Sequence, residues 1–331
     1  MDSLTQVVLG ASVAGVCAPA GQRRKALLLG AALGTLPDLD VFIDYGDAVR
    51  NFTYHRAFSH SLFVLAPFAL LLWLALKRWW APVRDAPGPW LAAISLALLT
   101  HPLLDAHTAY GTQLFWPMTV PPTMWGTIFI IDPLYTLPLL IGVLVAAFAA
   151  RAATARWFLR AGVALSTAYL GWTWIGQSIV AAKVENALAA QGLPDAPVFI
   201  TPTPLNTLLW RIVVQTDDGY LEGFESLIVD EESIQFESYE SDRAVLLEAG
   251  DVWAVQRLRW FSSDFLKASV IEDKLVLTDL RMGQEPMYVF MHVVAERGNP
   301  HWKPIPTEHI PIELEDRALG RTWQRIWEIN P

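Results

Sequence analysis

The chain has 331 residues and a net charge of −9; 53% of its residues are hydrophobic and only 17% are charged. A soluble globular domain carries about 25% charged residues, so this composition argues against a soluble protein. The acidic balance and the lack of clustered Lys and Arg exclude a nucleic-acid-binding protein, because a phosphate backbone requires a basic surface. The single cysteine, Cys17, excludes a disulfide framework and a thiolate metal site.

Six apolar windows follow one another in the first 182 residues, and each comes close to the roughly 20 residues that cross a bilayer. They lie at residues 3–20, 25–44, 60–76, 89–107, 126–150 and 157–182. One such window is compatible with a buried core helix, but six in succession predict a polytopic membrane bundle of about six helices. Asp2 stands where a secretory signal would carry positive charge, so we expect the first helix to be retained.

Basic residues in the short connections predict the orientation of these helices. One cluster, Arg23, Arg24 and Lys25, follows the first window. A second, Lys77, Arg78 and Arg84, follows the third window. A third, Arg151, Arg156 and Arg160, surrounds the junction of the fifth and sixth windows. Alternating helices place all three clusters on one side, which the positive-inside rule assigns to the cytoplasm. Both ends of the chain are then expected outside the cytoplasm.

The pattern changes after residue 183 to polar-flanked runs such as LLWRIVVQT, SIQFESY and PMYVFMHVVAE. Alternation of apolar and polar residues in these runs predicts half-buried antiparallel strands. We therefore expect a transmembrane metal-site domain at residues 1–183, a Pro-rich linker at 184–205 and an extracytoplasmic β-rich domain at 206–331. The predicted fold class is mainly α, a membrane helical bundle followed by a small β-rich extramembrane domain.

Asp and His residues gather at the ends of four windows. They occur in GTLPDLDVFIDYGD (Asp38, Asp40 and Asp44), YHRAFSHS (His55 and His60), LLTHPLLDAHTAYGT (His101, Asp105 and His107) and FIIDPLYTLP (Asp132). The topology drawn from Lys and Arg alone places all of them at the outer face. Ionisable residues in apolar segments are costly and mark function. A transport pathway would spread them over several depths, so their concentration at one face favours a site.

His101 and Asp105 are spaced i, i+4 and share one helical face, although Pro102 between them favours a kink. Imidazole and carboxylate without thiolate are typical of a divalent metal site, with Zn as the first choice and Mn or Fe(II) as alternatives. The candidate metal ligands are Asp38, Asp40, His55, His60, His101 and Asp105, enough for one or two ions. For any single His, a hydrogen bond between helices is the alternative.

The candidate catalytic residues are His55, Asp40 and Arg56. His55 or a carboxylate would accept the proton of an attacking water. Arg56 would hold a phosphate oxygen through its guanidinium, or would serve as an interfacial anchor.

Other polar residues of these segments have more ordinary interpretations. Asp132 caps its helix or orients a liganding His, and His107 has no favoured role. Asp44 belongs to a solvated loop. Ser59 is a suitable N-cap for the third helix, which would put His60 in its first turn.

Six motifs occur in order within the first 140 residues: MDSLTQ…LGA, GTLPDLD, HRxFSHS, HPLLD, YGT and IDPLYT. Together they resemble the YdjM-type family of predicted inner-membrane, metal-dependent hydrolases. The resemblance implies a bacterial multi-pass inner-membrane protein with a Zn-type site, and distant kinship to zinc-dependent phospholipase C proteins has been suspected for such families. Its metal motifs correspond here to Asp38 and Asp40, His55 and His60, and His101 and Asp105. Many relatives have His after the Thr of the opening motif, where this chain has Gln6.

The leading hypothesis is a membrane-bound metal-dependent hydrolase that cleaves a phosphoester or another ester of a lipid-linked substrate at the outer face of the inner membrane. Its expected partners are the lipid bilayer and a lipid or lipid-linked small molecule. One alternative is a transporter or metal-handling protein. Another is a non-catalytic scaffold with a structural metal, which a site closed by four protein ligands would favour.

Overall fold

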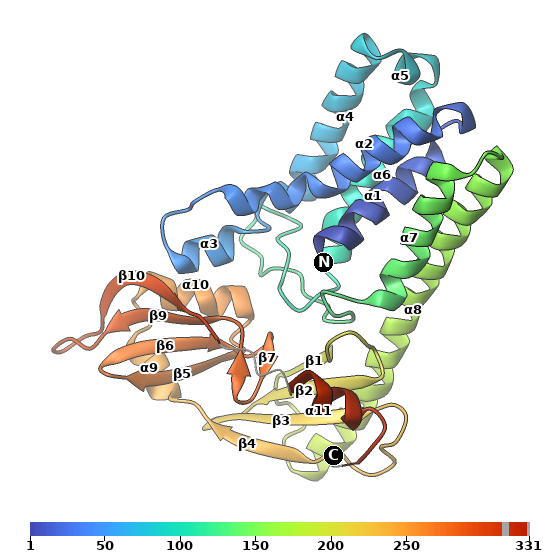
Figure 1. Ribbon diagram of the computed structural model, residues 1–331. Coiled ribbons are helices and arrows are strands. Elements are labelled where there is room, and N and C mark those ends of the chain that lie inside the picture. The colour runs from blue at the N-terminus through green and yellow to red at the C-terminus, as the bar shows by residue number, and fades with distance from the viewer. Residues whose placement is uncertain (313–317, 330–331) are drawn as a thin grey trace.

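The computed structural model describes residues 1–312 and 318–329. Its N-terminal part is helical and its C-terminal part consists of antiparallel sheets, which confirms this aspect of the predicted fold. Figure 1 shows the helices bundled side by side, with the sheets gathered at one end of the bundle and with α8 running from one part into the other.

Each of the six apolar windows contains a helix. These helices are α1 (Ser3–Cys17), α2 (Arg23–Thr35), α4 (Leu62–Trp79), α6 (Pro87–Asp105), α7 (Pro133–Phe148) and α8 (Ala152–Ala190). Shorter elements connect them: η1 (Ala20–Gln22), η2 (Pro37–Phe42), α3 (Ala48–Tyr54), η3 (Phe58–His60) and α5 (Ala81–Asp85). Residues 106–132 form a long irregular connection across the end of the bundle near the sheets (Figure 1).

Helices α1 and α2 pack so closely that only glycine fits at their crossing. A Cβ on Gly34 would lie 2.4 Å from the carbonyl oxygen of Gln6, and one on Gly30 would lie 2.3 Å from that of Gly10. Small residues of this kind allow membrane helices to approach backbone to backbone. The contact brings the end of α2 beside α1, where the candidate site lies.

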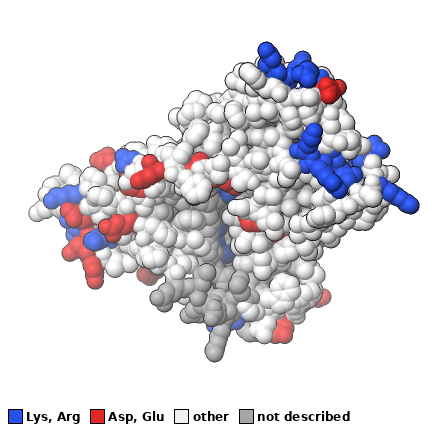
Figure 2. Space-filling model, turned by 45° about the horizontal axis from the view of Figure 1, so that its top comes forward, with Lys and Arg blue, Asp and Glu red and all other residues white. Residues whose placement is uncertain are grey.

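Two helices in the described part of the chain, α4 and α6, are long and apolar enough to cross a membrane. Helices α1 and α7 are apolar but shorter. The basic residues of the helical connections collect at the far end of the bundle, and Figure 2 shows blue residues there, separated by a mostly uncharged white region from the mixed charges of the sheets. Arg23 and Arg24 of α2 donate to the carbonyls of Ala149 and Ala147, which places two of the three basic connections side by side.

Helix α8 is longer than the expected sixth span because it continues to Ala190. Its last turns pack Val180, Val184 and Leu188 against the first sheet. Residues 184–190 therefore belong to this helix, and Val198–Pro202 form strand β1. The connection between the two parts is thus shorter than the linker expected at 184–205, because an apolar helix face and a paired strand occupy most of it.

Two four-stranded antiparallel sheets form the C-terminal part. The first has the order β1 (Val198–Pro202), β2 (Leu209–Gln215), β3 (Gly219–Ser226), β4 (Phe236–Glu240), and the second has the order β10 (Lys303–Ile310), β9 (Met291–Glu296), β6 (Lys274–Asp279), β5 (Leu266–Ile271). Strands β7 (Gly283–Gln284) and β8 (Met287–Tyr288) pair with each other, and α9 (Arg243–Glu248), α10 (Trp253–Ser262) and α11 (Ala318–Arg325) complete the part.

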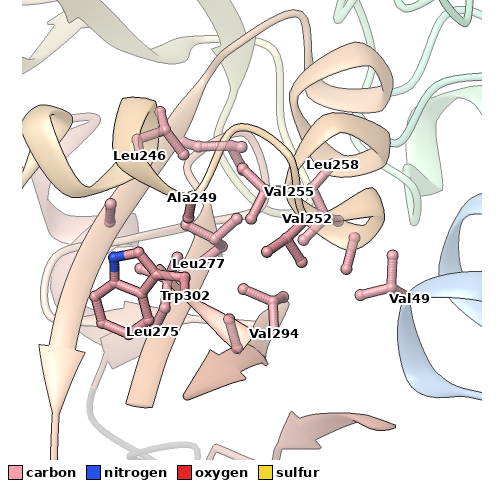
Figure 3. Close-up of a cluster of buried hydrophobic side chains, with 14 of the residues drawn as sticks. Val49, Leu246, Ala249, Val252, Val255, Leu258, Leu275, Leu277, Val294 and Trp302 are labelled. Atoms are coloured by element: carbon pink, nitrogen blue, oxygen red, sulfur yellow. The ribbon is translucent and has the colours of Figure 1, made fainter. Parts of the chain in front are cut away.

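Helix α3 joins the N-terminal part to the second sheet. Val49 and Phe52 of α3 belong to the buried core formed by α9, α10 and the second sheet. Figure 3 shows Val49 entering this core opposite Val252 and Leu258. The Arg257 guanidinium of α10 donates to the hydroxyl and the carbonyl of Thr53. The segment that carries His55 and Arg56 is therefore held directly by the C-terminal part.

Candidate metal centre

Four side chains from three segments, η2, η3 and α6, place one donor atom each around a common point. The Nε2 atoms of His60 and His101 are 3.1 Å apart. Asp38 Oδ1 lies 3.3 Å from both of them, and Asp105 Oδ2 lies 3.1 Å from His60 Nε2 and 3.3 Å from His101 Nε2. Among the residues that the structure describes, this is the one group of His, Cys, Asp and Glu with metal-site spacing.

These separations fit a divalent ion. A tetrahedral zinc ion with bonds of about 2.0–2.1 Å separates its donors by about 3.3–3.4 Å. The Asp105 Oδ2 atom is fully buried and has no hydrogen-bond partner among the described residues, which is costly unless a cation occupies the site. The side chains of His60, His101 and Asp105 are inaccessible, whereas that of Asp38 is 19% exposed. The His₂Asp₂ set is therefore suited to a metal and has one side toward solvent.

The other ring nitrogen of His101 determines which way its lone pair points. His101 Nδ1 lies 2.6 Å from the carbonyl oxygen of Gly34, and a carbonyl can only accept. The proton is therefore on Nδ1, and the Nε2 lone pair faces the site. The Gly34 carbonyl belongs to the end of α2 that packs closely on α1, and α6 passes through Pro102 without losing the i, i+4 contact to Asp105.

His60 is oriented by a chain of two hydrogen bonds. The Ser59 hydroxyl donates to Asp40 Oδ2 at 2.5 Å, so it accepts from His60 Nδ1 at 2.9 Å. This arrangement again leaves the Nε2 lone pair toward the common point. Asp40 thus acts on His60 through Ser59, because its carboxylate lies 3.9 Å from His60 Nδ1, away from Nε2.

Asp40 and His55 lie next to the four-residue group and not in it. His55 Nδ1 and Asp40 Oδ1 are 2.7 Å apart, and Asp40 Oδ2 also accepts the backbone N–H of Arg56 at 3.0 Å. Asp38 and Asp40 separate because η2 is a 3₁₀ turn of three residues per turn, in which residues two apart point in different directions. Of the six predicted ligands, the structure brings four together and pairs the other two with each other.

Arg56 is buried beside Asp105. Its Nε lies 3.4 Å from Asp105 Oδ2 and has no hydrogen-bond partner among the described residues. The residue has φ +61°, a left-handed conformation, and its carbonyl accepts the N–H of Gln113. A non-glycine residue in this region costs about 1–3 kcal/mol and is held there by its surroundings. Here the bonds to Asp40 and Gln113 hold it.

The first helix also reaches the site. Gln6 Nε2 donates to Asp105 Oδ1 at 2.9 Å, and the Met1 amino group pairs with the same oxygen atom. Gln6 thus orients a ligand from the side opposite the common point. Gln6 is a polar residue one helical turn after Asp2 in an apolar helix, and this position was the signal for it in the sequence. The sequence alone did not show which residue Gln6 contacts.

The remaining candidates lie away from the four donors. Asp132 is the N-cap of α7 and accepts the Tyr169 hydroxyl, and His107 donates to the carbonyl of Leu103. Asp44 accepts from Gly46 in an exposed loop. The N-cap of α4 is Ser61 instead of the expected Ser59, because His60 lies in η3 before the helix begins.

With this geometry in view, comparison with known proteins is informative. A family profile described as YdjM inner membrane protein matches residues 1–180. The chain belongs to the YdjM inner membrane protein family. The match contains all four donors together with Asp40, His55 and Arg56, and it ends within α8, before the sheets begin. Membership implies association with the lipid bilayer.

Relatives beyond the family profile add little on function. The chain is similar to the "Uncharacterized protein YfhP" of Bacillus subtilis (strain 168), with 27% identity over 140 residues. These residues are 40% of this chain and 42% of YfhP, so the match spans less than half of either protein. No solved structure matches the chain.

Proposed function

We propose that this YdjM family protein is a metal-dependent hydrolase that cleaves a phosphoester or another ester of a lipid-linked substrate at the outer face of the inner membrane. The observation that carries the proposal is the His₂Asp₂ group, whose donor atoms are spaced for one divalent ion next to a His55–Asp40 pair. Asp38, His60, His101 and Asp105 would hold the ion. When bound, the ion would polarise a phosphoryl or carbonyl oxygen as a Lewis acid.

The proton of the attacking water goes to His55 in this proposal. His55 Nδ1 donates to Asp40, so its Nε2 lone pair is free to accept a proton. The His55 ring centre lies 5.9 Å from that of His60, and its side chain is 22% exposed, so it is near the four donors and accessible to water. The Asp40 carboxylate stabilises the imidazolium that forms. Arg56 supplies positive charge for an anionic substrate oxygen.

The same geometry also supports a second function. Four protein donors that fill a tetrahedral ion are typical of a structural site, whereas catalytic zinc keeps a position open. The behaviour of Asp38 distinguishes a catalytic site from a structural site, because Asp38 is the one donor of the four whose side chain is exposed to solvent. If Asp38 stays bound, the ion only ties η2, η3 and α6 together, and the protein is a scaffold.

Hydrolysis measured together with metal content tests the proposal. We expect detergent-purified protein with one equivalent of Zn to hydrolyse phosphatidylglycerol or a polyprenyl phosphate, and a chelator to abolish the activity. His55→Gln should lower kcat by about 10²–10⁴-fold, the usual contribution of general base catalysis, and should keep its metal. Bound metal without hydrolysis of any lipid ester would contradict the hydrolase and favour the scaffold.

A further inference from the structure

A large cavity lies between the end of the helical bundle and the sheets. Its volume is about 1390 Å³, above the usual range of about 300–1,000 Å³ for small-molecule sites. On the helical side its wall is formed by residues 40–45 after α2, by α3 and by residues 128–131. On the other side it is formed by residues 201–205 and 282–290 of the sheets. Apolar side chains dominate this wall, so the cavity is built for a hydrocarbon occupant.

Part of the wall is also exposed apolar surface. Val41, Phe42 and Ile43 are 65%, 83% and 43% exposed, and Ile130 and Ile131 are 37% and 49% exposed. All five line the cavity. Large apolar side chains exposed in one patch mark a membrane or partner contact. We call these five residues the apolar rim.

The bilayer is the occupant that the surroundings of the apolar rim indicate. Ile131 is followed directly by α7, whose Leu134 and Leu137 are 58% and 48% exposed. The other half of the rim follows α2, whose Leu28 is 74% exposed. In an inner membrane protein, such outward apolar faces contact lipid. The apolar rim therefore connects the lipid-facing surface of the helices with the cavity.

The polar end of the cavity lies beside the candidate metal centre, whose four donors are not part of the cavity wall. Asp40, His55, Arg56 and Thr108 line the same space. Arg56 is 3% exposed, and its Nε lacks a hydrogen-bond partner among the described residues. Its pairing with Asp105, at 3.4 Å, is longer than the ion pairs of the two other arginines of the wall, Arg211 with Glu222 at 2.6 Å and Arg281 with Asp279 at 2.5 Å. Arg56 is therefore the cation of the wall best placed for an anionic head group.

We infer that the cavity takes up the hydrocarbon chain of an anionic membrane lipid, which enters sideways from the bilayer across the apolar rim and places its head group beside Arg56. The inference rests on the proposed function for what happens to the head group, but lipid uptake needs no hydrolysis. It assigns the C-terminal sheets a role as the far wall of the lipid site. Ordinary lipid around the bundle would not reach that wall.

Photo-crosslinking of the full chain in nanodiscs tests this route. The probe is phosphatidylglycerol with a diazirine near the end of one acyl chain, and labelled peptides are identified by mass spectrometry. We expect label on the exposed residues Phe68, Leu70 and Leu71 of α4 and also on residues 282–290 of the C-terminal part. Label on α4 without label on 282–290 would overturn the inference.

Variants distinguish entry of the lipid across the apolar rim from general contact between lipid and the helical bundle. Phe42→Asp combined with Ile131→Asp should lower label on 282–290 at least tenfold and leave label on α4 unchanged. Leu247→Asp, at an apolar residue that is 69% exposed and outside the cavity wall, is the matched control and should change neither. Unchanged label on 282–290 in the double variant would overturn the route across the rim.

Two further readouts keep this inference distinct from the proposed hydrolase. Phosphatidylglycerol should label residues 282–290 about tenfold more than the same probe built on phosphatidylcholine, and Arg56→Gln should remove that preference. Label should persist after the metal is chelated, so a failure of hydrolysis leaves this result intact. Hydrolysis of a short-chain ester by a protein with no label on 282–290 would retain the hydrolase and reject the lipid cavity.

Discussion

Two of the pairs of neighbouring histidines in the described part of the chain differ in what surrounds them. His60 and His101 have their Nε2 atoms 3.1 Å apart, and each has its Nδ1 proton engaged by Ser59 or by the Gly34 carbonyl. His292 and His309, in β9 and β10, have ring centres 5.6 Å apart. His309 bonds the Val289 carbonyl, and His292 Nδ1 has no partner among the described residues.

The difference shows that proximity of imidazoles does not make a metal site. At the first pair, two carboxylates lie within 3.3 Å of both Nε2 atoms, and second hydrogen bonds fix both rings. At the second pair, burial, reinforced by the neighbouring His309, lowers the pKa of His292 to about 4 although Asp279 and Asp47 oppose the shift. The first pair is arranged to bind a cation, whereas His292 of the second pair is arranged to stay neutral.

The largest expected effect is a difference in bound metal between variants of the two histidine pairs. His101→Ala should lower the bound Zn, Mn or Fe from about one equivalent to background, because it removes one of two imidazole donors. His309→Ala should keep the full equivalent. Elemental mass spectrometry of both detergent-purified variants makes the comparison, and stoichiometric metal in His101→Ala would remove this residue from the site.

Loss of the hydrogen bond behind His60 should give the next largest effect. Ser59→Ala disconnects His60 Nδ1 from Asp40, and such partners of a liganding His are worth about 10–100-fold in metal affinity. Competition with a fluorescent chelator measures the Kd. Ser178→Ala, at an exposed serine of α8 that bonds only its own helix, is the control and should leave the Kd unchanged. Equal Kd values for the two variants would refute the role of Ser59.

A methyl group at Gly34 tests the packing that places the carbonyl behind His101. Gly34→Ala would bring its Cβ to 2.4 Å from the Gln6 oxygen, so α1 and α2 must separate. We expect a loss of about 1–3 kcal/mol in the free energy of unfolding, the usual cost of overpacking, together with weaker metal binding. Denaturant unfolding measures the first and the chelator assay the second.

Gly171→Ala is the matched control for this variant. Nothing lies within 4 Å of the position of its Cβ in α8, so the substitution should leave stability equal or higher. A Gly34→Ala protein as stable as Gly171→Ala would show that the tight crossing of α1 and α2 is not formed.

The smallest expected effect is on the pH dependence of stability, and it concerns the second histidine pair. Since the pKa of His292 is lowered to about 4 from 6.5, the unfolded chain binds its proton first as the pH falls. The stability that this residue contributes is complete above pH 6.5 and is lost between pH 6.5 and 4, at up to about 1.4 kcal/mol per pH unit. His292→Gln should show a smaller loss of unfolding free energy from pH 7.5 to 5 than the wild type does.

His301→Gln, at an exposed histidine, provides the comparison for this titration. It should keep the wild-type dependence of stability on pH. If the wild type and His292→Gln lose equal stability, His292 does not remain neutral in the folded protein.

The sequence predicted the helical elements and much of the site for physical reasons that the structure makes clear. Apolar windows are intrinsic to each segment, so all six were found to contain helices. The i, i+4 spacing of His101 and Asp105 also follows from one helix and matches the observed 3.3 Å contact. The split between Asp38 and Asp40 was not foreseen, because it depends on a 3₁₀ turn that local composition does not specify.

Contacts between residues that lie far apart in the sequence could not be predicted. Gln6 meets Asp105 from 99 positions away, and Val49 of α3 completes a core built from residues beyond 240. The cavity likewise combines residues 40–56 with residues 201–205 and 282–290. No periodicity or motif reports such contacts, since they depend on how segments far apart in the sequence pack together in three dimensions.

X-ray absorption at the metal edge of the purified wild-type protein tests the central claim most directly. The four-donor group predicts a first shell of two imidazole nitrogens and carboxylate oxygens at about 2.0–2.1 Å, with the outer-ring scattering of two histidines and no sulfur. A protein that binds no metal after reconstitution, or a spectrum without histidine scattering, would contradict the claim.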